Sequence, residues 1–431
     1  MSVPAFGQVN CLTSTKLVCE VPTSAAVVAN AALGRAAGLT TAQGLAGAIN
    51  SAIGTQLTQL PIPSASVGLV NIKQEGNPIG IPYNNMGPIL GDRPDTVGRH
   101  HLFLGFSYQH FNFNAIDGID LKSFAVGFQA NTTINSLNSS TPDQAIVYGT
   151  ENTSVDFSFD QYVAIATYGL THTTDVSVAV PFNHVNLSSV TTNPQTYVYD
   201  TTIQTWYNNT PPNASTVSYP SSGSSSGVGD TVLSVKQMLG KENLKAVTAI
   251  GAAVRLPSGD ALNYLGSGTY GVNVNGLFEY RSRVSPRFKV GYQWNGASQL
   301  VNLSAAPSQH LPGGFQYDAG ADYSIFPGLS IAGDILGSQF VNSQSLQEKT
   351  INLAQNAQTP PPDSIVPAAS AANFPILANQ PNTYTTSNVS AGIKWLVKGH
   401  LLFYANVLVP LNNVGLRSDP VPLGGISYII R

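Results

Sequence analysis

Few side chains in this chain are spaced for enzymatic or metal chemistry. The seven histidines are scattered, and only His100 and His101 are neighbours. Adjacent residues on a strand point to opposite faces of a sheet, so one metal site would not use both rings. We therefore interpret the histidines as turn or interface residues and predict no metal site.

Other catalytic patterns are also missing from the sequence. The stretch Asp117–Asp120 has too few ligands for a calcium loop and is interpreted as a turn. Ser107 and His110 are close in sequence but fall on opposite faces of a strand, so they do not form a nucleophile and base. The sequence has no Gly-x-Ser-x-Gly elbow and no phosphate-binding loop. We expect no enzymatic activity and no cofactor.

The two cysteines, Cys11 and Cys19, lie close together in the sequence. In an oxidising compartment such a pair closes a small disulfide loop, and the alternative is two free thiols. Because nothing else in the chain suggests metal or thiol chemistry, we predict the disulfide.

Composition excludes several classes of protein. Charged residues make up only 10% of the 431 residues, against roughly 25% in soluble domains. Mean hydropathy is nevertheless only +0.04, and no run reaches the roughly 18 apolar residues of a membrane helix. A net charge of −3 with scattered Lys and Arg argues against nucleic acid as a partner. A chain that avoids charge yet is never continuously apolar fits strands with one face in lipid and one in water.

From residue 99 onward, apolar side chains recur at every second position. Examples are Leu102, Leu104, Phe106 and Tyr108, and later Phe288, Val290, Tyr292 and Trp294. One such run occurs in any half-buried sheet, whereas a long succession of them indicates a barrel or a very large sandwich.

Short and long connections alternate strictly between these runs. The short ones are 169–174, 240–242, 282–285, 327–328 and 398–399, and the long ones are about 114–151, 191–226, 257–267, 298–312, 342–383 and 412–420. Bacterial outer-membrane barrels have short periplasmic turns and longer external loops. The sequence therefore predicts an all-β, transmembrane, antiparallel up-and-down β-barrel of about twelve strands over residues 99–431. In this count residues 121–129 belong to the first external loop.

Residues 1–98 have a different character. Residues 24–37 and 41–60 are rich in Ala and Gly and are predicted to be helices, and residues 61–96 read as extended, Pro-rich chain. We interpret 1–98 as an N-terminal periplasmic or plug segment. Residues 1–8 lack the basic and long apolar regions of a signal peptide. An outer-membrane protein must cross the inner membrane, so our hypothesis is that the numbering starts inside a signal peptide or at a misassigned start.

The polar face of the strands collects nearly all of their charges. A Lys or Arg on the lipid face near mid-bilayer would cost roughly 2–4 kcal/mol, so we predict that these charges face the lumen. They are Asp156, Asp160, Asp230, Lys236, Lys245, Arg255, Glu279, Arg287, Lys289, Asp318, Asp322, Asp334 and Lys394. Two interpretations stay open: ion pairs that brace the wall, and a path for solutes.

Four short motifs follow one another in the middle of the chain. They are Tyr168-Gly169-Leu170-Thr171, the run from Asp175 to Phe182, Gly227-Val228-Gly229-Asp230 followed by Lys236, and Leu256-Pro257-Ser258-Gly259. In this order they resemble the outer-membrane protein family of meta-pathway phenol degradation, over residues 159–301 in detail and over the rest of the barrel loosely. The resemblance implies an outer-membrane barrel that transports hydrophobic or aromatic compounds. Related channels carry an N-terminal hatch inside the barrel, which suits residues 1–98.

The end of the chain departs from this pattern. Such barrels usually end in an aromatic residue that the barrel-assembly machinery reads, and this chain ends Tyr428-Ile429-Ile430-Arg431. Either Tyr428 serves as that signal or the signal is unusual.

Two functional hypotheses follow. The first is a channel or transporter in the bacterial outer membrane for small, hydrophobic or aromatic solutes, gated or plugged by residues 1–98. The alternative is a structural or interaction protein with a filled lumen, whose N-terminal helices dock a partner protein or another copy. Both hypotheses place the strands against outer-membrane lipid. Helices inside the lumen favour the first, and helices outside it favour the second.

Overall fold

The structure of the chain is a computed structural model. It describes residues 11, 14–23, 49–60, 86–134, 143–200, 205–208, 218–240, 244–301, 309–326, 328–352, 373–398 and 401–430. Its strands are β1 (Leu102–Ile116), β2 (Ile119–Asp120), β3 (Phe124–Ile134), β4 (Asp143–Gly169), β5 (Thr174–Asp200), β6 (Thr205–Asn208), β7 (Ser218–Val228), β8 (Thr231–Leu239), β9 (Ala246–Leu256), β10 (Gly271–Tyr280), β11 (Val284–Asn295), β12 (Gly313–Phe326), β13 (Leu329–Asn352), β14 (Asn373–Lys398), β15 (Leu401–Pro410), β16 (Leu416–Ser418) and β17 (Val421–Ile430).

Helical structure is short. Three-residue 3₁₀ helices lie at Leu17–Cys19 (η1), Ala261–Asn263 (η3) and Gln299–Val301 (η4), and residues 20–23 and 49–57 are α-helical. The helix expected at 41–60 is therefore seen over 49–57. Residues 24–48, including the helix expected at 24–37, lie outside the described residues, as do residues 61–85.

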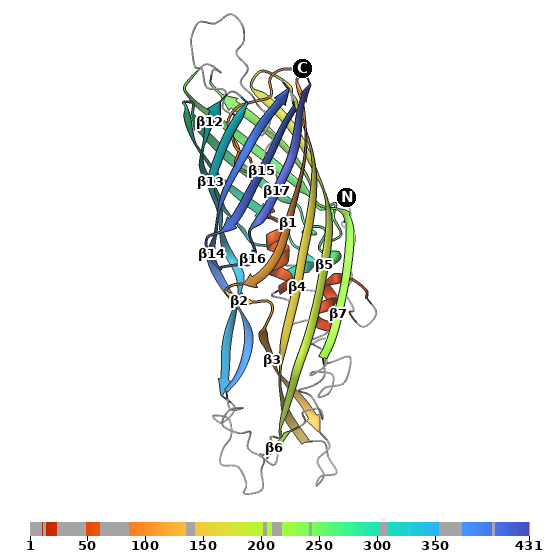
Figure 1. Ribbon diagram of the computed structural model, residues 1–431. Coiled ribbons are helices and arrows are strands. Elements are labelled where there is room, and N and C mark those ends of the chain that lie inside the picture. The colour runs from red at the N-terminus through yellow and green to blue at the C-terminus, as the bar shows by residue number, and fades with distance from the viewer. Residues whose placement is uncertain are drawn as a thin grey trace, which may run out of the picture.

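Twelve antiparallel strands close into a barrel, as the alternation of connections predicts (Figure 1). Consecutive barrel strands pair from β4 around to β15, and β5 pairs with both β7 and β8. Strand β17 closes the barrel by pairing with both β15 and β1. Strands β7 and β8 form one interrupted barrel strand opposite β5, and β16 and β17 form another opposite β1. The additional strands β2, β3 and β6 lie at the long-loop end.

The strands differ greatly in length, and this shapes the barrel. Strands β10 and β17 have 10 residues each, which matches the 9–11 residues that cross a bilayer. Strands β4 and β5 have 27 residues each, and at about 3.3 Å per residue each of them is about 90 Å long. The wall therefore extends far beyond one bilayer at the long-loop end, as Figure 1 shows. Residues 218–226, expected within the long connection 191–226, instead belong to strand β7.

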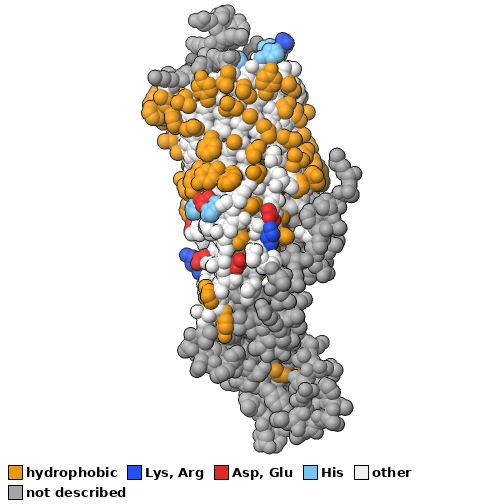
Figure 2. Space-filling model, turned by 90° about the vertical axis from the view of Figure 1, so that its right-hand side faces the viewer, with side chains coloured by type: hydrophobic (Ala, Val, Ile, Leu, Met, Phe, Trp, Pro, Cys, Tyr) orange, Lys and Arg blue, Asp and Glu red, His pale blue; other side chains and the backbone are white. Residues whose placement is uncertain are grey.

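Hydrophobic side chains form a band around the outside of the short-turn half (Figure 2). The band includes exposed residues on strands that are far apart in sequence, such as Phe106, Phe182, Val290, Trp395 and Ile426. Below the band in Figure 2, the described surface is mainly polar. An apolar belt on the outside of a closed antiparallel barrel is the surface that lipid requires.

Strand β4 shows that the outer half of the barrel reverses this pattern. Val155, Phe157 and Phe159 are buried inside, whereas Asp156 and Asp160 lie on the outer face of the strand. Beyond the band the outside is water rather than lipid, so polar residues face outward there and apolar ones face the helices within. The expectation that Asp156 and Asp160 face the lumen is wrong, because it assumed lipid along the whole strand.

Candidate functional site

Two described stretches of the N-terminal region, residues 49–60 and 86–98, lie within the barrel, and we call them the lumenal segment. The helix 49–57 packs its apolar side, including Ile49 and Ile53, into the same buried cluster as Phe157 and Phe159. The Tyr264 hydroxyl donates a hydrogen bond to the Asn50 side chain. Burial, and to a smaller extent the charge of Glu20, raise the pKa of Tyr264, so its hydroxyl stays a neutral donor.

A disulfide stabilises the start of the described chain. Cys11 and Cys19 are bonded with their Cα atoms 5.3 Å apart, which confirms the predicted pairing. The following residues reach the wall: Lys16 forms an ion pair of 2.7 Å with Asp260, and the Ser221 hydroxyl donates to Glu20 at 2.5 Å. These contacts attach the N-terminal region to β7 and to the connection between β9 and β10.

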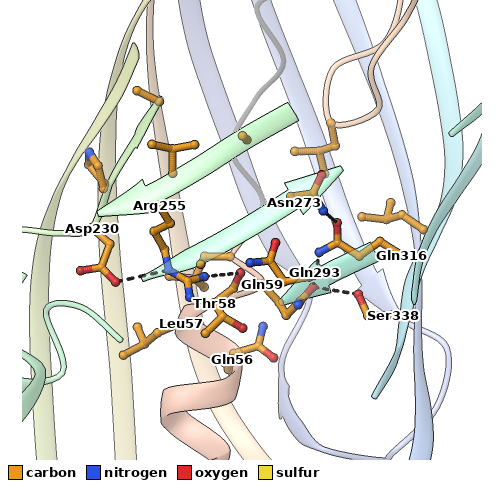
Figure 3. A pocket seen from close by; sticks show the side chains of 18 of the residues that line it. Gln56, Leu57, Thr58, Gln59, Asp230, Arg255, Asn273, Gln293, Gln316 and Ser338 are labelled. Carbon is orange, nitrogen blue, oxygen red and sulfur yellow. Dashed lines mark hydrogen bonds and ion pairs between the residues drawn. The ribbon is translucent and has the colours of Figure 1, made fainter. Parts of the chain in front are cut away.

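The helical part of the lumenal segment ends in polar contacts with the wall (Figure 3). The side-chain oxygen of Gln59 accepts hydrogen bonds from Gln316 at 2.9 Å and from Ser338 at 2.8 Å. Arg255 donates to the backbone carbonyl of Thr58 at 3.1 Å and lies 3.6 Å from Asp230. The segment is therefore bonded to β9, β12 and β13, which are separate strands of one wall.

Residues 86–98 make a second set of contacts, dominated by charge, nearer the short-turn end. Lys236 on β8 lies 3.3 Å from Asp92. Asp95 lies 3.3 Å from Arg93 and also pairs with Arg281, in the turn between β10 and β11. On the opposite part of the wall, the buried ammonium of Lys394 on β14 donates to the backbone carbonyl of Met86 at 2.8 Å. Charges of both signs thus hold this stretch on several sides.

A buried cluster on β11, β12 and β13 borders the same stretch. Arg287 pairs with Asp322 at 2.7 Å and also with Asp334, and all three side chains are essentially buried. A Cβ added at Gly91 would lie 2.5 Å from the Asp318 carboxylate and 3.2 Å from the Arg287 Nε. The backbone of the lumenal segment therefore passes directly over this cluster, and a side chain at position 91 would displace it.

The predicted lumen charges divide into three groups. Ten face the interior: Asp230, Lys236, Arg255, Glu279, Arg287, Lys289, Asp318, Asp322, Asp334 and Lys394. Asp156 and Asp160 face outward, and Asp160 accepts hydrogen bonds from Tyr108 and His110 on the outer surface. Lys245 is exposed in the connection between β8 and β9 rather than on a strand.

Several residues that matter in the lumen were not selected from the sequence. The counter-charges Asp92, Arg93 and Asp95 belong to the N-terminal region, and Arg281 lies in a short turn. The tetrapeptide Asp92-Arg93-Pro94-Asp95 holds three charges in a chain of which only 10% is charged. That local density of charge could have marked the tetrapeptide as functional. Its role depends on the wall charges that it pairs with, and these cannot be identified from the tetrapeptide alone.

The lumen contains a cavity of about 370 Å³ between the lumenal segment and the wall. Among the residues that the structure describes, its lining includes nine Asn and Gln residues and two aromatic residues, Phe111 and Tyr317. The nine are Gln56, Gln59, Gln161, Asn183, Asn273, Asn275, Gln293, Gln316 and Asn388. A cavity of this size is within the range of small-molecule sites.

Two features are absent from the described part of the chain. Within it, no group of three or more His, Cys, Asp or Glu side chains is placed to hold a metal ion. No helix among the described residues has the length and hydropathy needed to span a membrane.

A closed antiparallel barrel, an outward apolar band and a polar interior together define a membrane-spanning β-barrel of the outer-membrane type. No protein-family model matches the chain, and no curated protein sequence matches it. The class of the protein therefore rests on its own strands and side chains.

Several solved structures have a weak similarity to this chain. An outer-membrane channel of Pseudomonas putida F1 has a TM-score of 0.44 and 12% identity, and the match covers 78% of this chain and 98% of that one. The CymD monoaromatic hydrocarbon channel has a TM-score of 0.25 and 9% identity, covering 77% and 88%. A Salmonella typhi OmpF structure, solved as a complex with daunomycin, has a TM-score of 0.25 and 8% identity, covering 78% and 98%.

Proposed function

We propose that the protein is a channel of the bacterial outer membrane for small solutes, and that the lumenal segment is its gate. The observation that carries the proposal is the cavity of about 370 Å³ that lies between that segment and the polar wall. A rigid structural barrel gains nothing from such a space, because close-packed interiors leave few voids larger than a water molecule.

The nature of the contacts supports a segment that moves. Its attachments in the membrane half include ion pairs and hydrogen bonds, such as Lys236 to Asp92 and Gln316 to Gln59. Apolar contacts accompany them, among them those of Ile89 with Leu402 and Leu423. The polar contacts exchange for water when the segment leaves, whereas exposing the apolar ones costs free energy and so favours the closed state. The position of residues 49–60 within the barrel also favours a gated channel over a docking device outside it.

Deleting residues 1–98 is expected to raise the single-channel conductance in planar bilayers, since the lumen then loses the chain that occupies it. The deletion protein must first be shown to be a folded barrel, by its β-type circular dichroism and its heat-modifiable migration on gels. Equal conductance of the folded deletion protein and the full chain would exclude a gate and would favour a barrel that serves only as a structural or docking protein.

A further inference from the structure

The inward amides of the cavity form one continuous hydrogen-bonded ladder across β10, β12 and the lumenal segment. Asn275 donates to Asn273 at 2.8 Å, and Asn273 donates to Gln316 at 2.7 Å. Gln316 in turn donates to Gln59 at 2.9 Å. The ladder therefore runs from the wall to the gate, and each step uses an amide N–H₂ as donor and an amide oxygen as acceptor. Figure 3 shows the part from Asn273 through Gln316 to Gln59.

The wall end of this ladder lacks a donor. The side-chain oxygen of Asn275 is buried and accepts no hydrogen bond from any residue that the structure describes. That oxygen faces Gly251 on β9, so a solute reaches it only when the Asn275 side chain turns toward the cavity. A buried carbonyl oxygen without a donor is unfavourable, which favours such a turn toward a ligand that brings an O–H or N–H group. A hydrocarbon cannot supply one.

Two glycines give the Asn275 amide its place against the wall. Asn275 lies directly opposite Gly251 on β9 and Gly291 on β11. A Cβ at Gly251 would lie 2.6 Å from the Asn275 side-chain oxygen, and a Cβ at Gly291 would lie 2.8 Å from the Asn275 Cβ. Larger residues at either position would push the amide into the cavity. Glycine at both positions lets the amide lie against the wall and keeps the cavity in front of it open.

Six of the seven charges that line the cavity face an opposite charge within the protein, and the seventh, Arg417, donates to the Asn388 and Asn412 amides. Arg255 is matched by Asp230 and Lys236 by Asp92, while Lys289 and Asp318 lie directly opposite each other on β11 and β12. A strongly charged solute would have to compete with these partners. A neutral solute would meet amides that both donate and accept, as hydroxyl groups do.

We propose that this cavity binds a small, neutral, polyhydroxylated solute of the sugar or sugar-alcohol type. The inference deepens the proposed function and rests on it. Once the Asn275 side chain has turned into the cavity, a solute hydroxyl donates to its oxygen, and other hydroxyls bond to the neighbouring amides, including Gln59 of the gate. An aromatic hydrocarbon would leave the amides that it covers without partners, which is unfavourable.

Binding to the purified full-length protein tests this assignment by calorimetry, with glucose and sorbitol as polyols and phenol and toluene as aromatic probes. We expect saturable binding of a polyol and none of toluene. Gly251→Ala should weaken polyol binding about tenfold, the effect of losing one well-made hydrogen bond. Gly276→Ala is the matched control on β10, because a Cβ there would have no heavy atom within 4 Å.

A second pair of variants keeps the proposal testable if Gly251→Ala fails to fold. Asn275→Leu removes the unpartnered oxygen and should weaken polyol binding about tenfold or more. Asn406→Leu, also inward-facing but outside the cavity lining, should not. Tighter binding of phenol or toluene than of polyols, no polyol binding, or equal effects of each variant and its control would overturn the assignment. Conductance is measured separately, so a conducting channel that ignores polyols would refute the solute class and leave the channel intact.

Discussion

Replacing Arg287 by methionine is expected to destabilise the barrel by about 3–5 kcal/mol, since it removes a cation that two buried carboxylates share. Asp322 and Asp334 both pair with this guanidinium, and all three side chains are essentially inaccessible to water. Without Arg287 the two acids would have to be protonated or solvated by rearrangement of the wall. The measurement is urea unfolding of the protein in lipid vesicles, followed by tryptophan fluorescence.

Two controls separate this electrostatic effect from the loss of a long side chain. Lys289→Met makes the same kind of change two positions along β11, at a half-buried residue, and should cost less than about 1 kcal/mol. Adding Asp322→Asn and Asp334→Asn to Arg287→Met should restore most of the stability, because the buried acids that faced the lost cation are then neutral. The explanation by buried charge would be wrong if Arg287→Met were as stable as the wild type. It would also be wrong if the triple variant were as unstable as Arg287→Met alone.

Replacing Asp95 by alanine is expected to open the channel. Asp95 is buried in the lumenal segment and lies against two guanidiniums, those of Arg93 and Arg281. Loss of the shared carboxylate leaves like charges facing each other where the segment meets the turn between β10 and β11. Breaking a buried pair costs several kcal/mol, and each 1.4 kcal/mol changes an equilibrium about tenfold, so the open fraction should rise at least about tenfold.

Planar-bilayer recording measures that open fraction directly. Asp419→Ala is the matched control, since Asp419 is an exposed carboxylate at the long-loop end that accepts hydrogen bonds from Asn112 and Asn114. Its loss should leave gating unchanged. The interpretation of residues 86–98 as the charged half of a gate would fail if Asp95→Ala and Asp419→Ala gave the same open fraction as the wild type.

The sequence was sufficient for the architecture because two of its patterns are set by the membrane. Alternation of apolar side chains along strands such as β11 reflects lipid on one side, and alternation of connection length reflects the two sides of a bilayer. The strand count follows from the second pattern. Arg287 and Lys394 could be placed inside for the same reason, since a charge facing lipid is excluded.

Where lipid ends, the same reasoning fails. Phe157 and Phe159 resemble a lipid-facing row, yet they pack inward against the N-terminal helix in a part of the wall that water surrounds. The alternation of apolar and polar residues alone does not show which face of a strand is in contact with water. Strand β7 is hidden for a different reason: its Ser and Gly residues have low strand propensity, and only pairing with β5 makes it a strand.

The candidate site was the least accessible part of the molecule to sequence reasoning. The amide ladder joins Asn273 and Gln316 on the wall to Gln59, which lies far earlier in the chain. Neutral amides carry no charge or spacing that marks them as a group. The contact between these amides depends on strand register and on where the N-terminal chain enters the barrel. Neither can be predicted from the local sequence pattern.

The central claim is that the lumenal segment must leave the wall before solutes pass, and tethering it tests this most directly. Gln59→Cys with Ser338→Cys places thiols where the wild-type side chains hydrogen-bond at 2.8 Å. A reducible bifunctional thiol reagent then links the gate to β13, with wild-type protein given the same reagent and reductant as the control. We expect the linked channel to stay closed in planar bilayers and to regain wild-type conductance on reduction. A linked channel that conducts as well as the reduced one would contradict the account.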